Sequence, residues 1–359
     1  MKALVVSQYD DVVSARPEAR LVLELFRRGV AVEVVTNQPS VHTLEFEKAG
    51  IPVHFRHPKA KITLRGIWQL RKFIREGKFD IVHLFNSRAA SNGVWATVGL
   101  PVKVVTYRGA GGLYWHDPFA WLSHLHPRVD RISCLSKYVQ EQVNRQFFFR
   151  RKKTVVHYKA FLPEWFDGIQ AADLQGEGIP PDALVIGCVA NYRRVKGIET
   201  LIRSTWQLYQ DPRIHLVLIG KDMDNTGLQK TMADSPMRDR IHVLGYREDV
   251  YPLMQGFHIY VQPSNNEGLS KSVMEAMLLG LPCVVTNAGG MPELFPGPES
   301  GIIVKTRDHR SMAGAILRLA NEPRLREDMG SEGRSAILAN FSMDAYARGV
   351  LDMYRELLD

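Results

Sequence analysis

Cysteine is scarce in this sequence, and long apolar runs are missing from it. Only three cysteines occur among 359 residues, Cys134, Cys188 and Cys283, and each lies alone in a short apolar segment. Their odd number and wide spacing exclude a disulfide scaffold and the usual zinc-binding patterns. No apolar run approaches the roughly 18 residues of a membrane-spanning helix, and the apolar start is too short for a signal peptide. We therefore expect buried thiols and a cytoplasmic location.

Negative charge is in short supply in the first half of the chain. Residues 1–181 hold 26 Lys and Arg against 16 Asp and Glu, whereas residues 182–359 hold 20 against 22. Basic residues next to aromatic ones suit an anionic membrane surface, which attracts each cation by about 1 kcal/mol. The densest such stretch consists of Phe147, Phe148, Phe149, Arg150, Arg151, Lys152 and Lys153. It indicates either peripheral contact with the inner face of a membrane or a solvated loop whose phenylalanines enter the core. No nucleic-acid-binding motif accompanies the charge, so nucleic acid is not an expected partner.

Short apolar segments alternate with amphipathic ones along the whole chain. The pattern predicts parallel sheets covered by helices on both faces. One predicted helix follows the first strand, with Pro17 in its first turn and Gly29 at its end. The predicted strands are KALVVSQ, VAVEVVT, GIPVHF, DIVHLF, VKVVTYRG, RISCLS, LVIGCVAN, IHLVLIG, IHVLGY, HIYVQPS and PCVVTN.

A stretch rich in Gly, Pro and acidic residues interrupts the alternation at residues 173–184 and predicts a linker. The expected organisation is a Rossmann-like domain over residues 1–172 and a second Rossmann-like domain over residues 185–342; the family resemblance described below implies that the first binds the acceptor and the second the nucleotide-sugar. The two doubly wound α/β domains would face each other across a ligand-binding cleft. An amphipathic helix over residues 343–359 is expected to pack on one domain or on both.

The stretch SNNEGLSKSVMEAMLLGLPCVVTNAGG, residues 264–290, predicts a strand end, a turn and a helix. Ser270 is a candidate N-cap, and free backbone N–H groups of Gly268, Leu269 and Ser270 would then suit a phosphate. Glu267 and Glu275 flank this turn and are placed to bind sugar and ribose hydroxyls. In the alternative interpretation, Glu267 only caps the helix and Glu275 is a surface residue.

A second motif, CVANYRRVKGIETLI, places a basic loop between a strand and a helix. Arg193, Arg194 and Lys196 at this position are able to neutralise a diphosphate leaving group. A solvated basic turn is the alternative.

The segment EGLSKSVMEAMLLGLPCVVTNAGGMPEL closely resembles the E-x(7)-E signature of the retaining glycosyltransferases of family four, which have the GT-B fold. The resemblance implies that Glu267 contacts the donor sugar, that Glu275 contacts the ribose, and that Gly268, Leu269 and Ser270 hold phosphate and sugar. Lys196 matches the phosphate-binding lysine of the family. The family's arginine lies five residues before it, where this chain has Asn191, so Arg193 or Arg194 is expected to replace it. The similar segment VLGYREDVYPLM adds Arg247 to the donor side.

In the first half, the resemblance is looser. Where the family has a Gly-Gly loop, this chain has DDVVSARPEAR, whose Arg16 and Glu18 are assigned to the acceptor side. Arg108 occupies the place of a histidine near the sugar and is expected to bind a donor phosphate or an acidic acceptor. An ion pair within the loop is the alternative for it. The remaining acceptor-side candidates are Asn86, Arg88 and His116.

The resemblance implies sugar transfer from a nucleotide-diphosphate sugar with retention and without a metal or other cofactor. A glycan or lipid-linked acceptor of a bacterial envelope polysaccharide or lipopolysaccharide is expected, and a soluble acceptor is the alternative. A non-enzymatic nucleotide-sugar-binding protein and a nucleotide-sugar epimerase of similar architecture stay open as other functions.

Overall fold

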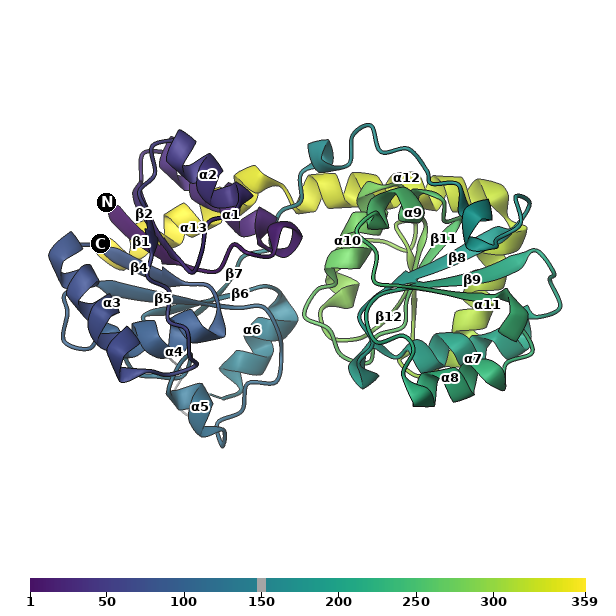
Figure 1. The fold of residues 1–359 in the computed structure, drawn as a ribbon, viewed down its shortest axis with the longest axis horizontal. Helices are drawn as coiled ribbons and strands as arrows, with labels where there is room; N and C mark the ends of the chain where they lie inside the picture. The colour runs from purple at the N-terminus through teal and green to yellow at the C-terminus, as the bar shows by residue number, and fades with distance from the viewer. Residues whose placement is uncertain (147–152) are drawn as a thin grey trace. The chain divides into compact units, whose positions relative to one another are not determined.

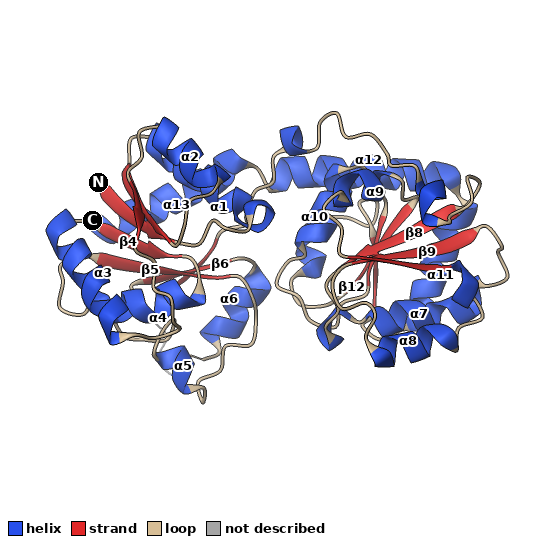
Figure 2. Ribbon diagram, viewed as in Figure 1, coloured by secondary structure: helices blue, strands red, loops and turns tan. Residues whose placement is uncertain are grey.

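The computed structural model describes residues 1–146 and 153–359 and divides the chain into two compact units (Figure 1). The first unit consists of residues 1–160 and 341–359, and the second of residues 161–340. Each has its own parallel sheet between helices (Figure 2). The predicted α/β architecture of two doubly wound domains is confirmed. Residues 147–152, which hold most of the predicted membrane-contacting stretch, lie outside the described residues.

The sheet of the first unit has the strand order β3-β2-β1-β4-β5-β6-β7, and every pair in it is parallel. Segments such as LVV and VEVV, apolar apart from the partly buried Glu33, form its central strands because both faces of the sheet carry helices. Its strands are β1 Lys2–Val6, β2 Ala31–Thr36, β3 Val53–Phe55, β4 Ile81–Leu84, β5 Lys103–Arg108, β6 Arg131–Cys134 and β7 Thr154–Val156. Its helices are α1 Val12–Arg27, α2 Val41–Lys48, α3 Leu64–Gly77, α4 Ser87–Ala96, α5 Pro118–Trp121, α6 Lys137–Asn144 and α13 Met343–Leu358.

The sheet of the second unit has the order β10-β9-β8-β11-β12-β13 and is also parallel throughout. Its strands are β8 Leu184–Val189, β9 Ile214–Ile219, β10 Ile241–Gly245, β11 Ile259–Gln262, β12 Cys283–Thr286 and β13 Ile302–Val304. Its helices are α7 Ile198–Leu208, α8 Thr226–Ala233, α9 Val250–Gln255, α10 Lys271–Leu278, α11 His309–Asn321 and α12 Pro323–Asn340. In both units, the carboxyl ends of all strands meet at one edge, where the loops that carry candidate site residues begin.

The units divide at residue 160, whereas the sequence analysis placed a linker at residues 173–184. The acidic, Gly-rich stretch is part of the second unit because its residues bind there. Just before the stretch, the Ala172 N–H donates to the Pro252 carbonyl at 2.9 Å, and within it Glu177 forms an ion pair with Arg247 at 2.6 Å. A segment with the composition of a linker is therefore held in the second unit by backbone and charged contacts.

The C-terminal helix α13 belongs to the first unit, one of the placements that its amphipathic pattern allowed. Tyr354 is fully buried, and its hydroxyl lies 2.7 Å from Nδ1 of His83 on β4. Asp344 accepts a hydrogen bond from Arg28 at 2.8 Å, which joins α13 to the end of α1. The last residues of the chain thus complete the core of its first unit.

Helix α1 begins earlier than predicted. Its first residue is Val12, and the Asp11 carboxylate caps it by accepting from the Ser14 N–H at 2.9 Å. Pro17 therefore lies inside the helix and not in its first turn, which is a correction. The predicted loop around Arg16 and Glu18 is helical for the same reason.

Two strands escaped prediction, β7 and β13, each of three residues at one end of its sheet. Their apolar runs, TVV and IIV, are too short to distinguish a strand from part of a helix or loop, although the equally short β3 lies in a predicted segment. The three cysteines are buried and unpaired, as predicted, and burial raises the pKa of Cys134 and of Cys188 to about 12. Over the described residues, the helices include none with the length and apolarity that crossing a membrane requires.

Candidate functional site

Two loops of the second unit meet at the carboxyl ends of the adjacent strands β8 and β11. The Asn265 N–H donates to the Val195 carbonyl at 2.7 Å, and the Asn265 side-chain amide donates to the Arg194 carbonyl at 3.2 Å. Between them, Gly197 adopts φ +64°, and a Cβ atom there would lie 2.1 Å from the Pro263 carbonyl oxygen. A glycine is thus required for this close approach, which fixes the basic loop against the turn after β11.

This contact brings Lys196 to Glu267. The Lys196 Nζ lies 2.5 Å from Glu267 Oε2, and the Ser264 hydroxyl donates to the same oxygen at 3.3 Å. Both charged side chains are largely shielded from solvent, with 15% and 17% of their surface exposed. A cation and a carboxylate in direct contact at a partly buried position form the charged centre of the candidate site.

The turn between Glu267 and α10 carries open backbone donors. Gly268, Leu269 and Ser270 are buried, yet their N–H groups donate no hydrogen bond within residues 1–146 and 153–359. Buried N–H groups without a partner are costly, so a ligand oxygen at this place gains free energy by accepting from them. The position at the N-terminus of a helix adds attraction for an anion.

Ser270 occupies the N-cap position of α10, but its hydroxyl does not cap the helix. The hydroxyl lies 3.1 Å from that of Ser272, which in turn donates to Gln262 Oε1 at 3.1 Å. The predicted capping hydrogen bond is therefore wrong. The Ser270 hydroxyl instead belongs to a series of side-chain hydrogen bonds that runs through Ser272 to Gln262 on β11.

Glu275 lies in the second turn of α10 and is 95% buried, so it is not a surface residue. Its Oε1 accepts from the Tyr251 hydroxyl on α9 at 2.8 Å and lies 3.5 Å from Lys271 Nζ. Tyr251 was not predicted as a site residue, although it lies in the quoted segment VLGYREDVYPLM. Glu267 and Glu275 thus rest on different partners, one on the basic loop and one on α9.

The arginines predicted for the donor side have distinct surroundings. Arg193 and Arg194 are both exposed, and Arg194 lines a cavity of about 460 Å³ together with Arg203 and Arg307. Arg247 contacts both oxygens of Asp249, at 2.8 and 2.7 Å, in addition to Glu177. These carboxylates raise its pKa above the ordinary arginine value.

In the first unit, Glu18 is buried in α1 beside a lysine that the sequence analysis missed. Lys159 forms an ion pair with Glu18 Oε1, and the Ser7 hydroxyl donates to Glu18 Oε2 at 2.9 Å. Lys159 follows the unpredicted strand β7, so no sequence signal pointed to it. Glu18 also lines a cavity of about 250 Å³ with Ser7 and Asn86. Arg16, on the same helix, is partly exposed.

Arg108 ends β5 and binds its own loop. Its Nε and Nη2 donate to the carbonyls of Ala110 and Gly111, both at 2.7 Å, and within residues 1–146 and 153–359 no carboxylate forms an ion pair with it. Burial lowers its pKa below the ordinary value. The guanidinium shapes the Gly-rich loop that follows the strand.

The other acceptor-side candidates lie at loop positions of the first unit. Asn86 caps α4 by accepting from the Ala89 N–H at 2.9 Å, and its side-chain amide lies 3.1 Å from His57 Nε2. Arg88 is exposed on α4. His116 is exposed and stacks on Tyr114 with ring centroids 5.3 Å apart. Lys153, the described end of the basic stretch, donates to the Val129 carbonyl at 2.5 Å.

Two family models cover most of the chain between them. The model "Glycosyltransferase Family 4" matches residues 19–161, and the model "Glycosyl transferases group 1" matches residues 170–336. The chain belongs to glycosyltransferase family 4.

Individual relatives of this glycosyltransferase are distant. It is 22% identical over 181 residues to N-acetyl-alpha-D-glucosaminyl L-malate synthase of Bacillus anthracis, a match over 50% of this chain and only 48% of that protein. It is 22% identical over 310 residues to UDP-Gal:alpha-D-GlcNAc-diphosphoundecaprenol alpha-1,3-galactosyltransferase of Escherichia coli, over 82% of this chain and 80% of that protein.

Among solved structures, this glycosyltransferase is similar to Anabaena Alr3699/HepE in complex with UDP. The TM-score is 0.80 at 18% identity, over 99% of this chain and 100% of that chain. At this identity, the likeness shows the fold, which is GT-B. Within the described residues, no group of three or more His, Cys, Asp or Glu is arranged to hold a metal ion.

Proposed function

We propose that the protein is a retaining, metal-independent glycosyltransferase that moves a sugar from a nucleotide-diphosphate sugar to a glycan or lipid-linked acceptor. The observation that carries the proposal is the pairing of Lys196 with Glu267 beside the open N–H groups of Gly268, Leu269 and Ser270. A cation and helix N-terminal donors suit a diphosphate, and an adjacent carboxylate suits sugar hydroxyls.

Donor binding in this proposal exchanges one ion pair for another. A diphosphate oxygen takes the place of Glu267 Oε2 beside Lys196, and the open amides donate to the same phosphate. The Glu267 carboxylate is then released to accept from hydroxyls of the donor sugar. Glu275 binds the ribose hydroxyls through the carboxylate that Tyr251 and Lys271 now hold.

Transfer breaks the bond between the anomeric carbon and the diphosphate oxygen and forms a bond from that carbon to the acceptor oxygen. Negative charge grows on the departing diphosphate, where Lys196, Arg193 or Arg194, and the open amides stabilise it. The departing oxygen takes the acceptor proton on the same face of the sugar, so the anomeric configuration is retained. Arg108 and Glu18 are proposed to serve the acceptor side.

The proposed acceptor belongs to a bacterial envelope polysaccharide or lipopolysaccharide. The name of the Escherichia coli relative specifies an acceptor linked to diphosphoundecaprenol, and its match extends over most of both chains. The name of the Bacillus anthracis relative specifies malate, but that match covers half of each chain. A lipid-linked acceptor agrees with the excess of cations in residues 1–181, which favours peripheral contact with an anionic membrane.

The test begins with a thermal-shift screen of UDP-, GDP- and ADP-sugars, followed by transfer assays with the donor that stabilises the protein. We expect transfer in the presence of EDTA, a product with the anomeric configuration of the donor by NMR, and loss of transfer in Lys196→Ala and Glu267→Ala. Lys230→Ala, which removes an exposed cation of α8, is the matched control.

Near-normal turnover in both site variants or inversion of the anomer would refute the proposal. Donor binding without transfer or donor hydrolysis in a long incubation would instead support a nucleotide-sugar-binding protein. Flotation with anionic vesicles at low salt tests the membrane contact, and an absence of binding contradicts it.

A further inference from the structure

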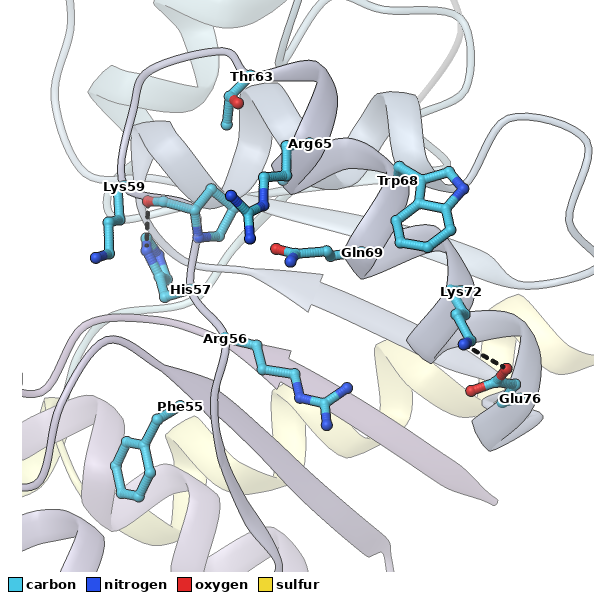
Figure 3. A pocket seen from close by; sticks show the side chains of 12 residues that line it. Phe55, Arg56, His57, Lys59, Thr63, Arg65, Trp68, Gln69, Lys72 and Glu76 are labelled. Atoms are coloured by element: carbon cyan, nitrogen blue, oxygen red, sulfur yellow. Dashed lines mark hydrogen bonds and ion pairs between the residues drawn. The ribbon is translucent and has the colours of Figure 1, made fainter.

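A further cavity, larger than the two described above, is lined only by residues of the first unit. It has a volume of about 780 Å³ and lies between the segment that follows β3 and helix α3 (Figure 3). Figure 3 shows side chains reaching the cavity from both of these elements. The residues that line it are Phe55, Arg56, His57, Pro58, Lys59, Thr63, Arg65, Gly66, Trp68, Gln69, Lys72 and Glu76.

The cavity carries positive charge that the protein leaves uncompensated. Of the described carboxylates, none lies within ion-pair distance of Arg56, Lys59 or Arg65, whereas Lys72 lies 4.0 Å from Glu76. The sequence explains the imbalance, because residues 56–78 contain eight Lys and Arg and a single Glu. Arg56 lies over the Phe73 ring, with its guanidinium carbon 5.6 Å from the ring centroid, but no carboxylate in the described part of the chain balances its charge. Cations without a carboxylate partner around one concavity repel each other, so an anionic ligand relieves a cost that the free protein bears.

The same cavity presents aromatic faces and neutral polar groups. Trp68 is 64% exposed and Phe55 is 46% exposed, although aromatic side chains of this size are usually buried to a greater extent. Gln69 on α3 offers both a donor and an acceptor to a hydroxyl group. Cations, an indole face and an amide together match a saccharide ring that bears an acidic group.

One hydrogen bond joins this cavity to the acceptor-side candidates. His57 lines the cavity, and its Nε2 lies 3.1 Å from the side-chain amide of Asn86. Asn86 lines the neighbouring 250 Å³ cavity, which also contains Ser7 and Glu18. Because β3 and β4 are parallel strands of one sheet, the loops that carry His57 and Asn86 leave from the same edge. The His57–Asn86 contact therefore links the linings of the two cavities at the carboxyl edge of the first sheet.

We infer that the cavity between the β3–α3 segment and α3 binds an acidic saccharide unit of the acceptor, one that carries a carboxylate or a phosphate. Arg56 and Arg65 bind the acidic group, Trp68 packs against the sugar ring, and His57 and Asn86 hold the boundary with the site of transfer. This inference rests on the proposed function, since it assigns the acceptor's chemistry. A saccharide is favoured over a membrane surface because the cations line a hollow, together with hydroxyl-binding groups, and do not form a convex face.

The probes are trigalacturonic acid and glucose 6-phosphate, with maltotriose as the neutral counterpart, and binding is followed by saturation-transfer NMR and calorimetry. We expect the wild-type protein to bind at least one acidic probe in the millimolar range or tighter, more weakly at high salt, and maltotriose far less. Arg56→Ala/Arg65→Ala and Trp68→Ala should each weaken acidic binding by about 10-fold or more. Lys48→Ala/Lys103→Ala, which removes two exposed cations elsewhere in the first unit, should leave it unchanged.

Donor binding separates this inference from the proposed function. The Arg56→Ala/Arg65→Ala variant should bind UDP like the wild type, because the residues proposed to hold the nucleotide lie in the second unit. A wild-type protein that neither binds nor transfers from a nucleotide-sugar refutes the proposed function, whereas binding of the acidic probes tests this cavity alone. The inference is overturned if neither acidic probe binds, if maltotriose binds as well as they do, or if the double variant binds them normally. It is also overturned if the double variant keeps the wild-type affinity for both acidic probes and loses only the binding of phosphatidylglycerol vesicles.

Discussion

Lys196 and Glu267 are 71 residues apart in the chain, yet the Lys196 Nζ lies 2.5 Å from Glu267 Oε2. They meet because β8 and β11 are neighbours in the second sheet and because Gly197 allows the two loops to touch. The pair holds Lys196 beside the open amides of the turn, with Glu267 as its partner in the ligand-free protein. A ligand phosphate therefore competes with a carboxylate for the same cation.

This competition predicts opposite effects on binding from the two partners. Glu267→Gln should tighten binding of UDP by about 10-fold, since it frees Lys196, and should still reduce transfer by about 100-fold or more. Lys196→Gln should weaken UDP binding and transfer together. Calorimetry with UDP and initial-rate assays measure the two quantities. Weaker UDP binding in Glu267→Gln would contradict the exchange of partners.

Glu275 gives a second prediction on the donor side. Glu275→Gln removes a charged acceptor proposed for the ribose, so UDP affinity should fall by about 10-fold. A matched comparison uses uridine diphosphate and inorganic pyrophosphate, because only the nucleotide carries the ribose. Equal losses for both ligands would place Glu275 in the support of α10 and not at the ribose.

Gly197 predicts an effect on stability. Gly197→Ala places a Cβ against the Pro263 carbonyl at a left-handed backbone position, so the second unit should lose more than about 1 kcal/mol. Gly314→Ala is the control, because Gly314 lies inside α11 with open space around it. That change should stabilise by up to about 1 kcal/mol. Thermal unfolding measures both, and an unchanged Tm in Gly197→Ala would be inconsistent with the close approach.

The buried pair of Glu18 and Lys159 predicts a strongly non-additive response. Glu18→Gln leaves the Lys159 ammonium without its carboxylate and should cost about 3 kcal/mol of unfolding free energy. Lys159→Met should cost a similar amount, for the converse reason. The double variant should cost less than the sum of the two, as chemical denaturation of all four proteins will show. Additive losses would mean that the two side chains act separately.

Buried histidines predict a loss of stability on mild acidification. Burial lowers the pKa of His157 to about 4 and that of His124 to about 3, whereas both titrate near 6.5 in the unfolded chain. At pH values between the folded and unfolded pKa values, these histidines are therefore protonated in the unfolded state and neutral in the folded state. Their contribution is fully present above pH 6.5 and is lost as the pH falls toward the folded pKa values.

The measurement is the unfolding free energy from chemical denaturation at pH values between 7 and 5. Most carboxyl groups have pKa values below this window. His157→Gln should reduce the slope of the unfolding free energy against pH by up to about 1.4 kcal/mol per pH unit. The matched variant is His116→Gln, which replaces an exposed histidine of the same unit. A slope unchanged in His157→Gln would show that this imidazole does not resist protonation in the folded protein.

The strand and helix pattern was readable from the sequence because buried parallel strands are continuous apolar runs. The central strands β1, β2, β8 and β9 all lie in predicted segments. The three-residue strands β7 and β13 were missed because so short an apolar run does not distinguish a strand from other structure, whereas the equally short β3 lay within the longer segment GIPVHF. Lys159 was missed with β7, although it is the partner of a predicted residue.

The candidate site was partly predictable for a related reason. Spacing alone placed Glu267 in the turn before the helix and Glu275 about a turn and a half into it, and the resemblance gave them roles. It could not indicate that Ser270 binds Ser272 and not the helix end, or that Arg247 is already engaged by Asp249 and Glu177. Side-chain partners depend on which loops meet, and local sequence does not specify that.

The order of residues by itself determined two parallel α/β units, the turn before α10 and the family, because apolar periodicity and turn residues act over short distances. Tertiary structure alone decided that Lys196 pairs with Glu267, that Tyr251 holds Glu275, and that α13 completes the first unit. It also gathered Arg56, Arg65 and Trp68 around one cavity. The physical reason is that charge, hydrogen bonding and shape act through space, between side chains that only the packing of distant segments brings within reach.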